Sequence, residues 1–543
     1  MEPDSSSLLD AAIRAHDAAV AACGLDVWIG AEPTFTDRHS ESPEWLTDAL
    51  GDAKQDRACH IIGQLRSSYP GALVLRTLGR QYPEEAGPRW SLGLYWRRDG
   101  HTLADDLPRD PLSESCACET QEMNAFWQSL AGQLNCKGLA ATAFEVEIEM
   151  GLRILFTADT QTISVDPSAD PRLVRAPVQS QAIPPKGLED DLATEGLYLV
   201  SIGCAPSGTE NSLQPCIELP GFADVELFAD FVQRVAIAAS AAGLTSLVWR
   251  GFPPPVDSSV AWMTLTPDPA VLEINEAPAA SVAEFLAMSR RLFAVAESEG
   301  LAPYRLQYNG VISDSGGGGQ FTLGGPSPER SPFFLEPLLL PRLVSYLNQH
   351  PALSYWFAPL YVGSFSQSPR PDENVLESFS ELQVALQHLA AAKNAQPEFI
   401  WRSLSPFLVD TSGNPHRSEM NIEKLWNPDL PGRGCLGLVE FRAFRMAMDA
   451  ESATAIAAML RALAAMLSQK FYGKNFFRVV YLIPMACPPI AVAFLWRMML
   501  HPDIGVFNSI LKLIGLQGVK WTTDAHIAPF TIIMVDVWEW TPF

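Results

Sequence analysis

Hydrophobic and polar positions along the chain alternate between the period of a helix and that of a strand. An alanine-rich helix is predicted from the serines at 5–7 to about residue 23, followed by a short strand at 25–30. Helical spacing returns at 52–67, and a second strand follows at 72–78. Apolar side chains at 453–470 fall on one face of an amphipathic helix. The mixture predicts an α+β fold.

The regular pattern is interrupted between residues 166 and 190. The prolines of this stretch stand among Asp, Ser, Arg and Gln side chains: Pro167, Pro171, Pro177, Pro184 and Pro185. Such a composition is typical of a linker or a long surface crossing. The sequence therefore predicts two parts of one domain at 1–165 and 191–470, with 166–190 between them.

After residue 470 the chain changes character. The run from Val479 to Trp496 carries no charged residue and is close to the roughly 20 residues that cross a bilayer. Lys474, Arg478 and Arg497 flank this run, as basic anchors would. Prolines interrupt it, which a membrane bundle tolerates better than a water-exposed helix does. We expect 471–543 to contribute a short membrane segment; the alternative is a proline-broken core segment.

Charged side chains stand on strand-like apolar runs. Glu440 and Arg442 alternate with apolar residues at 436–444, so they share one face of the predicted strand. Glu273 lies in a similar run at 271–276. Burying such charges is costly unless each has a partner. They either neutralise each other as structural pairs or face a site for a metal or an anion, and their recurrence favours an active site.

Other segments carry candidate groups of the same kind. Glu32 is predicted to project from the end of the strand at 25–30, and Glu419 lies in an acidic segment with His416 and Arg417. For Glu419, His416 and Arg417 the alternative is a solvated turn, and for Glu32 it is an ordinary surface glutamate. The neighbouring Glu423 and Lys424 are predicted to form an ordinary exposed pair.

A glycine run and an aromatic block complete the set. Gly316, Gly317, Gly318 and Gly319 precede a short strand that begins near Gln320, and such a run lets backbone N–H groups approach a ligand closely. It is neither a Walker loop nor a dinucleotide fingerprint, and a flexible linker is the alternative. A second block, with Arg89 and Trp90, could clamp an anionic ligand or lay its arginines over a packed core.

Composition narrows the class of protein. The 543 residues are 48% hydrophobic and 18% charged, which indicates a globular chain. The net charge of −24 leaves no basic stripe, so no nucleic-acid role is expected. The nine cysteines lack framework spacing, which fits a reducing compartment, and Cys116 with Cys118 is only a weak zinc candidate. No signal peptide is evident in Met1 to Asp10. We expect residues 1–470 to be cytoplasmic.

One reaction, ATP-dependent ligation, would use separated strand carboxylates, arginines and a glycine loop together. Glutamates would hold Mg²⁺ on the nucleotide phosphates, because hard oxygen ligands suit that ion. Arginines would stabilise charge on the transferring phosphoryl group. An amine then attacks the acyl phosphate, so no serine, cysteine or histidine nucleophile is required.

A series of ordered motifs resembles a known family. The motifs are Gly30 to Phe35, Pro88 to Gly100, Pro267 to Asn275, Gly316 to Gly325, His350 to Tyr355, Ser366 to Arg370, and Glu440 to Arg442. Over about residues 20–468 they resemble the bacterial amidoligases often linked to transglutaminase-like domains. The resemblance implies a glutamine-synthetase-like carboxylate–amine ligase with a curved antiparallel sheet, flanking helices, ATP and Mg²⁺.

The resemblance also implies roles for individual residues. The metal-binding carboxylates would be Glu32, Glu273, Glu419 and Glu440. The arginines on phosphate or substrate would be Arg417 and Arg442, with Gln320 also in the catalytic set. The nucleotide would contact Gly316 to Gly319, Arg89 and His416. Many relatives have Asn-His where Gly319-Gln320 stand here, and glutamine cannot act as a general base.

The last segment resembles a different family. The runs Phe477 to Met485, His501 to Gly505 and Asp536 to Phe543 are similar to the permease subunit of sugar-type ABC importers. Over 471–543 the resemblance implies inner-membrane contact without the coupling loop and most of the spanning helices.

The sequence thus predicts an ATP/Mg²⁺-dependent amidoligase acting on carboxylate and amine substrates, with transglutaminase-like proteins as partners. Two alternatives remain. One is a non-catalytic relative that binds a nucleotide or peptide, suggested by Gln320, and the other is a membrane transport component, suggested by 471–543.

Overall fold

The computed structural model describes residues 5–79, 82, 85, 87–114, 116, 118–136, 138–158, 166, 169–177, 192–193, 195–206, 213–358, 366, 368–373, 378–392, 396–428, 434–469 and 489–540. The chain forms two compact units, Met1–Ser468 and Gln469–Phe543. Most of the predicted crossing at 166–190 lies outside the described residues, as does the part of the predicted apolar span before Pro489.

The larger sheet of the first unit has ten strands within the described residues. Their order is β2 (Thr34–Phe35), β11 (Val271–Glu276), β10 (Val260–Asp268), β4 (Trp90–Arg97), β3 (Leu73–Leu78), β9 (Val248–Gly251), β8 (Leu213–Leu219), β7 (Leu197–Pro206), β6 (Leu152–Thr157) and β5 (Ala140–Glu145). Neighbouring strands pair antiparallel, except that β9 runs parallel to both β3 and β8. The predicted α+β class is confirmed, and β9 makes the sheet mixed rather than purely antiparallel.

A smaller sheet carries the candidate residues Glu32, Gln320 and Glu440. Its order is β1 (Trp28–Glu32), β14 (Gln320–Gly324), β16 (Val439–Phe441) and β15 (Met420–Asn421), all antiparallel. Pro33 separates β1 from β2, and its carbonyl accepts the backbone N–H of Ile274 on β11 at 3.0 Å. The two sheets therefore meet where β1, β2 and β11 come together. A separate hairpin pairs β12 (Tyr304–Leu306) with β13 (Ile312–Asp314).

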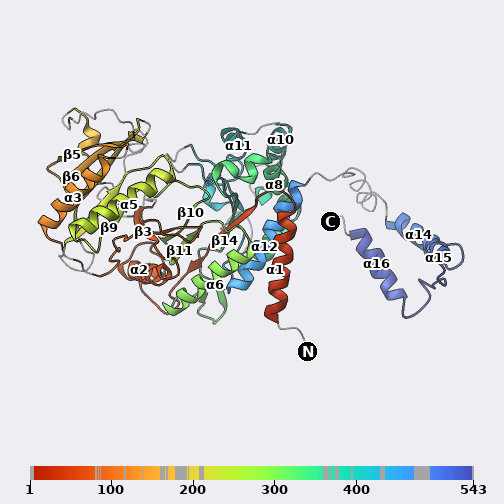
Figure 1. The fold of residues 1–543 in the computed structure, drawn as a ribbon. Coiled ribbons are helices and arrows are strands. Elements are labelled where there is room, and N and C mark those ends of the chain that lie inside the picture. The colour runs from red at the N-terminus through yellow and green to blue at the C-terminus, as the bar shows by residue number, and fades with distance from the viewer. Residues whose placement is uncertain are drawn as a thin grey trace. The chain divides into compact units, whose positions relative to one another are not determined.

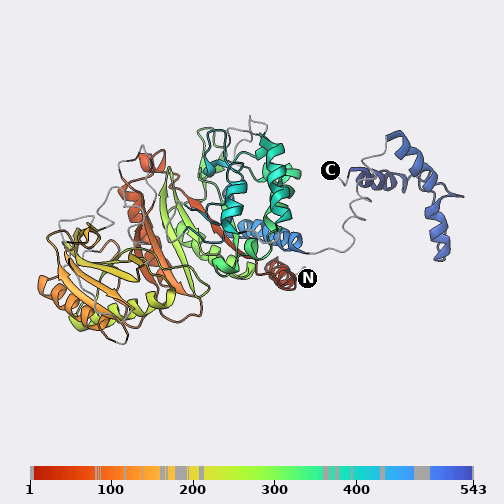
Figure 2. The ribbon, with the colours of Figure 1, turned by 90° about the horizontal axis from the view of Figure 1, so that it is seen from above.

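Helices cover the sheets in three groups, each with its own hydrophobic core (Figures 1 and 2). The strands β5 to β9 pack under α3 (Thr120–Leu134) and α5 (Val225–Ala242). The strands β10, β4 and β11 pack under α2 (Asp52–Arg66) and α6 (Val282–Ser298).

The third core joins the smaller sheet to the remaining helices of the first unit. These are α1 (Ser5–Ala21), α7 (Pro332–Leu335), α8 (Leu339–Gln349), α9 (Pro351–Phe357), α10 (Ser378–Ala391), α11 (Pro397–Leu404) and α12 (Ala450–Ser468). The helices and the strand predicted near 5–23, 52–67, 72–78 and 453–470 are confirmed by α1, α2, β3 and α12. The strand predicted at 25–30 forms at Trp28–Glu32 instead, so Glu32 is the last residue of β1 and does not follow it.

Helix α12 is long and apolar enough to cross a membrane by composition. It packs against α1, α6 and α8, and its buried Arg461 forms an ion pair with Asp17 of α1. Arg461 also donates to the Val27 and Ala280 carbonyls. A charge satisfied in this way indicates a core helix of a folded domain.

The second unit holds α14 (Pro489–Met499), α15 (Val506–Leu513) and α16 (Ala528–Trp540). Its small core centres on Trp496 and Leu500, and the Asn508 side chain ties the Pro502 and Val519 carbonyls together at 2.8 and 2.9 Å. Large apolar side chains stay exposed, including Leu513 at 85% and Phe530 at 73%.

Candidate functional site

Strand pairing in the smaller sheet aligns candidate residues across one face. Glu32 at the end of β1 lies opposite Gln320 at the start of β14. Phe321 lies opposite Phe441 on β16, so Arg442, the next residue, comes beside Gln320. The Arg442 Nη1 donates to Gln320 Oε1 at 3.0 Å. Residues from three strands, distant in sequence, therefore form one row.

Glu440 shares this face because it lies two residues before Arg442. Its Oε1 forms an ion pair with the Arg442 guanidinium. Glu440 is 2% exposed, and the Arg442 side chain is 11% exposed. The predicted sharing of one face is confirmed. The pair is structural, but it is also only one part of a larger group of charges.

Lys424 lies at the centre of that group. Its Nζ donates to Glu32 Oε1, forms an ion pair with Glu440 Oε2 at 3.3 Å and donates to Asn275 Oδ1 at 3.3 Å. Glu273 joins through Asn275, whose Nδ2 donates to Glu273 Oε1 at 2.9 Å. The prediction that Glu423 and Lys424 form an ordinary exposed pair is wrong: Glu423 pairs with His416, and the Lys424 ammonium contacts carboxylates on β1 and β16 and the Asn275 amide oxygen on β11. We call Glu32, Glu273, Glu440 and Lys424 the carboxylate cluster.

The charges of the cluster give its carboxyl groups different pKa values. Burial, reinforced by Glu440 and opposed by Lys424, raises the pKa of Glu32 to about 7. Burial alone would also raise the pKa of Glu440, but Lys424 and Arg442 outweigh it and lower that pKa to about 2. Burial, together with Asp268, raises the pKa of Glu273. Burial opposes the charge on Lys424, yet the surrounding glutamates raise the pKa of its ammonium above the ordinary value. The cluster therefore contains one firmly ionised carboxylate and one carboxyl poised near neutral pH.

The glycine run lies between β13 and β14 and packs closely on its surroundings. The Gly319 N–H donates to the Phe444 carbonyl at 3.0 Å, and Gly316 N–H donates to Asp314 Oδ1 at 3.1 Å. Thr34 Oγ1 donates to the Gly318 carbonyl at 2.6 Å. A Cβ on Gly319 would lie 2.8 Å from Met446 Cα, so this position requires glycine. The run leads directly to Gln320. Part of the backbone of the glycine run is already engaged in these hydrogen bonds.

Glu419 reaches the row through its backbone, since its carbonyl accepts the Arg442 N–H at 2.8 Å. Its buried carboxylate lies elsewhere, accepting from Ser354 Oγ at 2.8 Å and lying 3.5 Å from Arg370 Nη1. Arg370 is 1% exposed and also donates to the Leu347 and Asn348 carbonyls. The structure thus places the Glu419 carboxylate in an ion pair with Arg370.

The remaining predicted residues have partners of their own. His416 Nε2 lies 3.1 Å from Glu423 Oε2, and its charge also lowers the pKa of Glu440. Arg417 donates to the Ser366 carbonyl at 3.1 Å and lies 3.7 Å from Asp410.

Arg89 pairs with Glu85 at 2.7 Å and with Asp268, and it lies over the Tyr82 ring. The structure brings together Glu32, Glu273, Glu440, Arg442 and Gln320, places His416 beside them, and pairs Arg417 and Arg89 with other groups.

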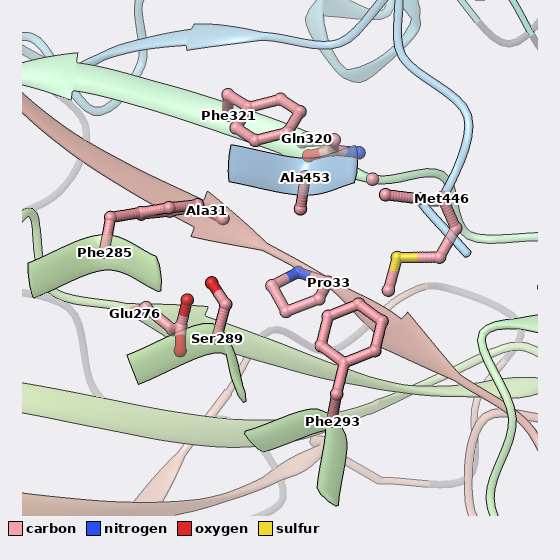
Figure 3. A pocket seen from close by; sticks show the side chains of 12 residues that line it. Ala31, Pro33, Glu276, Phe285, Ser289, Phe293, Gln320, Phe321, Met446 and Ala453 are labelled. Atoms are coloured by element: carbon pink, nitrogen blue, oxygen red, sulfur yellow. The ribbon is translucent and has the colours of Figure 1, made fainter. Parts of the chain in front are cut away.

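A different carboxyl lies on the opposite side of β11. Glu276 is 5% exposed, and neither carboxyl oxygen makes a hydrogen bond within the described residues. It borders a cavity of about 20 Å³, room for about one water molecule. Figure 3 shows its carboxyl beside the Ser289 side chain, among Ala31, Pro33 and Phe285. Burial raises the pKa of Glu276 to about 8.

Comparison with known proteins identifies the family. The family described as "Putative amidoligase enzyme (DUF2126)" matches residues 6–182 and 209–481. The chain belongs to this amidoligase family. The matched ranges contain every residue of the carboxylate cluster and Arg442. No solved structure matches this amidoligase-family protein.

Curated proteins match only a short stretch of the amidoligase-family chain. It is 39% identical over 80 residues to a probable ABC transporter permease protein, y4oQ, of Sinorhizobium fredii, covering 15% of this chain and 26% of that protein. It is 38% identical over 80 residues to the trehalose/maltose transport system permease protein MalF of Thermococcus litoralis, covering 15% and 27%. The chain thus spans about a quarter of the length of these permeases, and the resemblance is weak.

The cluster of the amidoligase-family protein has the donor chemistry of a Mg²⁺ site but not an open arrangement. Carboxylate and amide oxygens are the ligands that this ion prefers. Within the described residues, however, no three Asp, Glu, His or Cys side chains converge in a metal-binding geometry. The Lys424 ammonium lies among the oxygens where a cation would be held. As arranged, the carboxylates are compensated by the protein's own cation.

Proposed function

We propose that this protein is an ATP-dependent carboxylate–amine ligase that uses Mg²⁺ and forms an amide bond through an acyl phosphate. The observation that carries the proposal is the convergence of Glu32, Glu273 and Glu440 around Lys424, with Arg442 beside them. Membership of the amidoligase family supports the same reaction class.

The charges of the cluster suit phosphoryl transfer to a carboxylate. In that step a substrate carboxylate oxygen bonds to the terminal phosphorus of ATP, and the bond to the ADP oxygen breaks. Arg442 and Lys424 would stabilise the phosphoryl oxygens, because a guanidinium and an ammonium are strong partners for them. The buried site would strengthen these interactions by excluding water.

The second step requires a base. The amine nitrogen bonds to the acyl carbon, inorganic phosphate leaves with the electrons of the broken C–O bond, and the nitrogen loses a proton. The departing phosphate would accept that proton, because the cluster carboxylates would be holding Mg²⁺. Gln320 cannot take this role; its amide oxygen accepts from Arg442 and fixes that guanidinium in the row.

We further propose that the first unit works in the cytoplasm, where ATP is available, with transglutaminase-like proteins as functional partners. The second unit would provide membrane contact through its exposed apolar side chains, such as Leu513 and Phe530.

The test is ATP turnover by the full-length protein against a panel of amino acids and peptides. ADP release that needs both an acid and an amine, and that Glu440→Gln abolishes, is expected. Glu226→Gln, an exposed substitution on α5, is the matched control. Nucleotide binding without turnover under any pairing would favour the non-catalytic alternative.

A further inference from the structure

The Lys424 ammonium lies where the predicted metal ion would be held. The ammonium contacts side-chain oxygens of Glu32, Glu440 and Asn275. A divalent ion in the cluster would need the same oxygens. The lysine side chain is 28% exposed, whereas those of Glu32 and Glu440 are 5% and 3% exposed. The carboxylates are therefore held in place by the protein interior, while the lysine reaches them from a more open side.

Electrostatics make the two occupants exclusive. A divalent ion and an ammonium held by the same carboxylate oxygens would repel each other strongly at contact distance. Arg442 already adds a second positive group beside Glu440. Lysine is suited to move, because its charge sits on a flexible four-carbon stem.

We propose that Lys424 is a resident counter-ion that a divalent cation must displace from the carboxylate cluster. The ammonium keeps the buried glutamates compensated until the ion arrives. The identity of the ion as the Mg²⁺ of ATP rests on the proposed function.

The experiment measures Mn²⁺ binding to the full-length protein by electron paramagnetic resonance, without nucleotide. Lys424→Met and Lys424→Gln remove the competing charge, so each is expected to bind Mn²⁺ at least about tenfold more tightly than the wild type. Lys424→Arg retains a cation and should bind no more tightly than the wild type. Lys520→Met removes the same charge from an exposed position in the second unit and should change nothing.

Circular dichroism gives a second readout. The neutral variants should lose thermal stability without metal and recover it when Mn²⁺ is added. Unchanged or weaker Mn²⁺ affinity in both neutral variants would overturn the proposal while leaving the ligase function intact. Variants that stay unfolded even with Mn²⁺ would also overturn it. If the wild type binds no Mn²⁺–ATP either, the proposed function fails as well.

A second, independent observation concerns a larger cavity. It has a volume of about 430 Å³, in the range of small-molecule sites. Its walls come from β13, the end of α9, the segment after β16 and the first turns of α12. Three lining side chains are unusually exposed for their size: Trp356 at 75%, Ile312 at 56% and Met448 at 46%. An apolar ligand group would cover them.

The same cavity displays one cation and one anion. Arg445 is exposed, and its guanidinium makes one long hydrogen bond, 3.4 Å, to the Trp356 carbonyl. Asp314 stands on another wall, where Gly316 N–H donates to its Oδ1. Its Oδ2 is buried and makes no hydrogen bond within the part of the chain that the structure describes. A ligand with both charges would complement the two groups.

We infer that this cavity binds a free amino acid with a large apolar side chain as a zwitterion. Arg445 receives the carboxylate, Asp314 receives the ammonium, and Trp356 covers the side chain. Asp314 ends β13, two residues before the glycine run that leads to Gln320, so the ligand lies next to a segment of the candidate site. That the ligand is the amine substrate rests on the proposed function.

Calorimetry with L-phenylalanine, its amide and its N-acetyl derivative tests the assignment without ATP. The amide and the N-acetyl derivative should bind at least about tenfold more weakly, because each lacks one charge. Arg445→Met should weaken binding of phenylalanine but not of its amide. Arg402→Met, another exposed arginine, is the control and should have no effect.

Equal affinities for the three ligands, no binding, or no effect of Arg445→Met would overturn this assignment. ADP release that phenylalanine stimulates equally in wild type and Arg445→Met would overturn it and preserve the ligase function. Phenylalanine binding without turnover in any condition would preserve this assignment and overturn the ligase function.

Discussion

The two faces of β11 place a glutamate in different surroundings. On one face, Glu273 and Asn275 join the cluster around Lys424. On the other, Glu276 faces a small, largely apolar cavity without a hydrogen-bond partner within the described residues. Compensation lowers the pKa of Glu440 to about 2, whereas burial alone raises that of Glu276 to about 8. Depth alone does not decide the charge of a carboxyl group here: Lys424 and Arg442 together lower the pKa of Glu440, whereas burial and Glu440 outweigh Lys424 at Glu32.

The comparison predicts that the compensated face carries the chemistry. Glu440→Gln removes the ionised carboxylate and leaves Lys424 and Arg442 without their shared partner. We expect ATP turnover to fall by about 1,000-fold, at the upper end of the loss from removing one electrostatic group. Steady-state ADP release measures it. Turnover within about tenfold of the wild type would place the chemistry elsewhere.

Glu276→Gln should change stability and its pH dependence instead. The pKa of Glu276 is raised from its ordinary value of 4.5 to about 8, so the folded state holds a proton that the unfolded state releases. This contribution is complete below about pH 4.5 and is lost as the pH rises through about 8. Relative to its difference from the wild type at pH 4, the variant should gain roughly 5 kcal/mol of stability at pH 9.

Urea unfolding between pH 5 and 9 measures that gain. Glu226→Gln, on the surface, should reproduce the wild-type dependence on pH. A Glu276→Gln profile parallel to the wild type would show that Glu276 ionises without cost in the folded state.

A double-mutant cycle sharpens the account of the compensated face. Glu32→Gln removes the negative charge, Lys424→Met removes the ammonium, and the double variant lacks both. We expect a coupling free energy of about 1–3 kcal/mol, because the pair is buried and directly bonded. Additive effects in chemical unfolding would contradict a direct interaction.

The smallest effect is expected at Arg417. Its guanidinium pairs with Asp410 and the Ser366 carbonyl at a partly exposed position, so Arg417→Met should change turnover less than about threefold and stability by less than about 1 kcal/mol. Arg442→Met, in the row itself, should impair turnover far more. Equal losses in the two variants would restore the predicted role of Arg417 on phosphate.

Local patterns predicted part of this arrangement. Alternation placed Glu440 with Arg442 and identified Glu273 as a strand carboxylate, because a strand's period of two depends only on neighbours. Lys424 was missed for the opposite reason. Its partners Glu32 and Asn275 lie 392 and 149 residues away, so only tertiary pairing reveals that its charge is needed. The Glu419 carboxylate similarly depends on Arg370, which the sequence does not associate with it.

The most direct test of the central claim is the binding of Mn²⁺–AMP-PNP to the wild type, Glu440→Gln and Glu276→Gln, measured by calorimetry. The account predicts that Glu276→Gln binds as the wild type does and that Glu440→Gln loses binding by at least about tenfold. Equal binding by all three proteins, or a loss confined to Glu276→Gln, would show that the carboxylate cluster is not the nucleotide site.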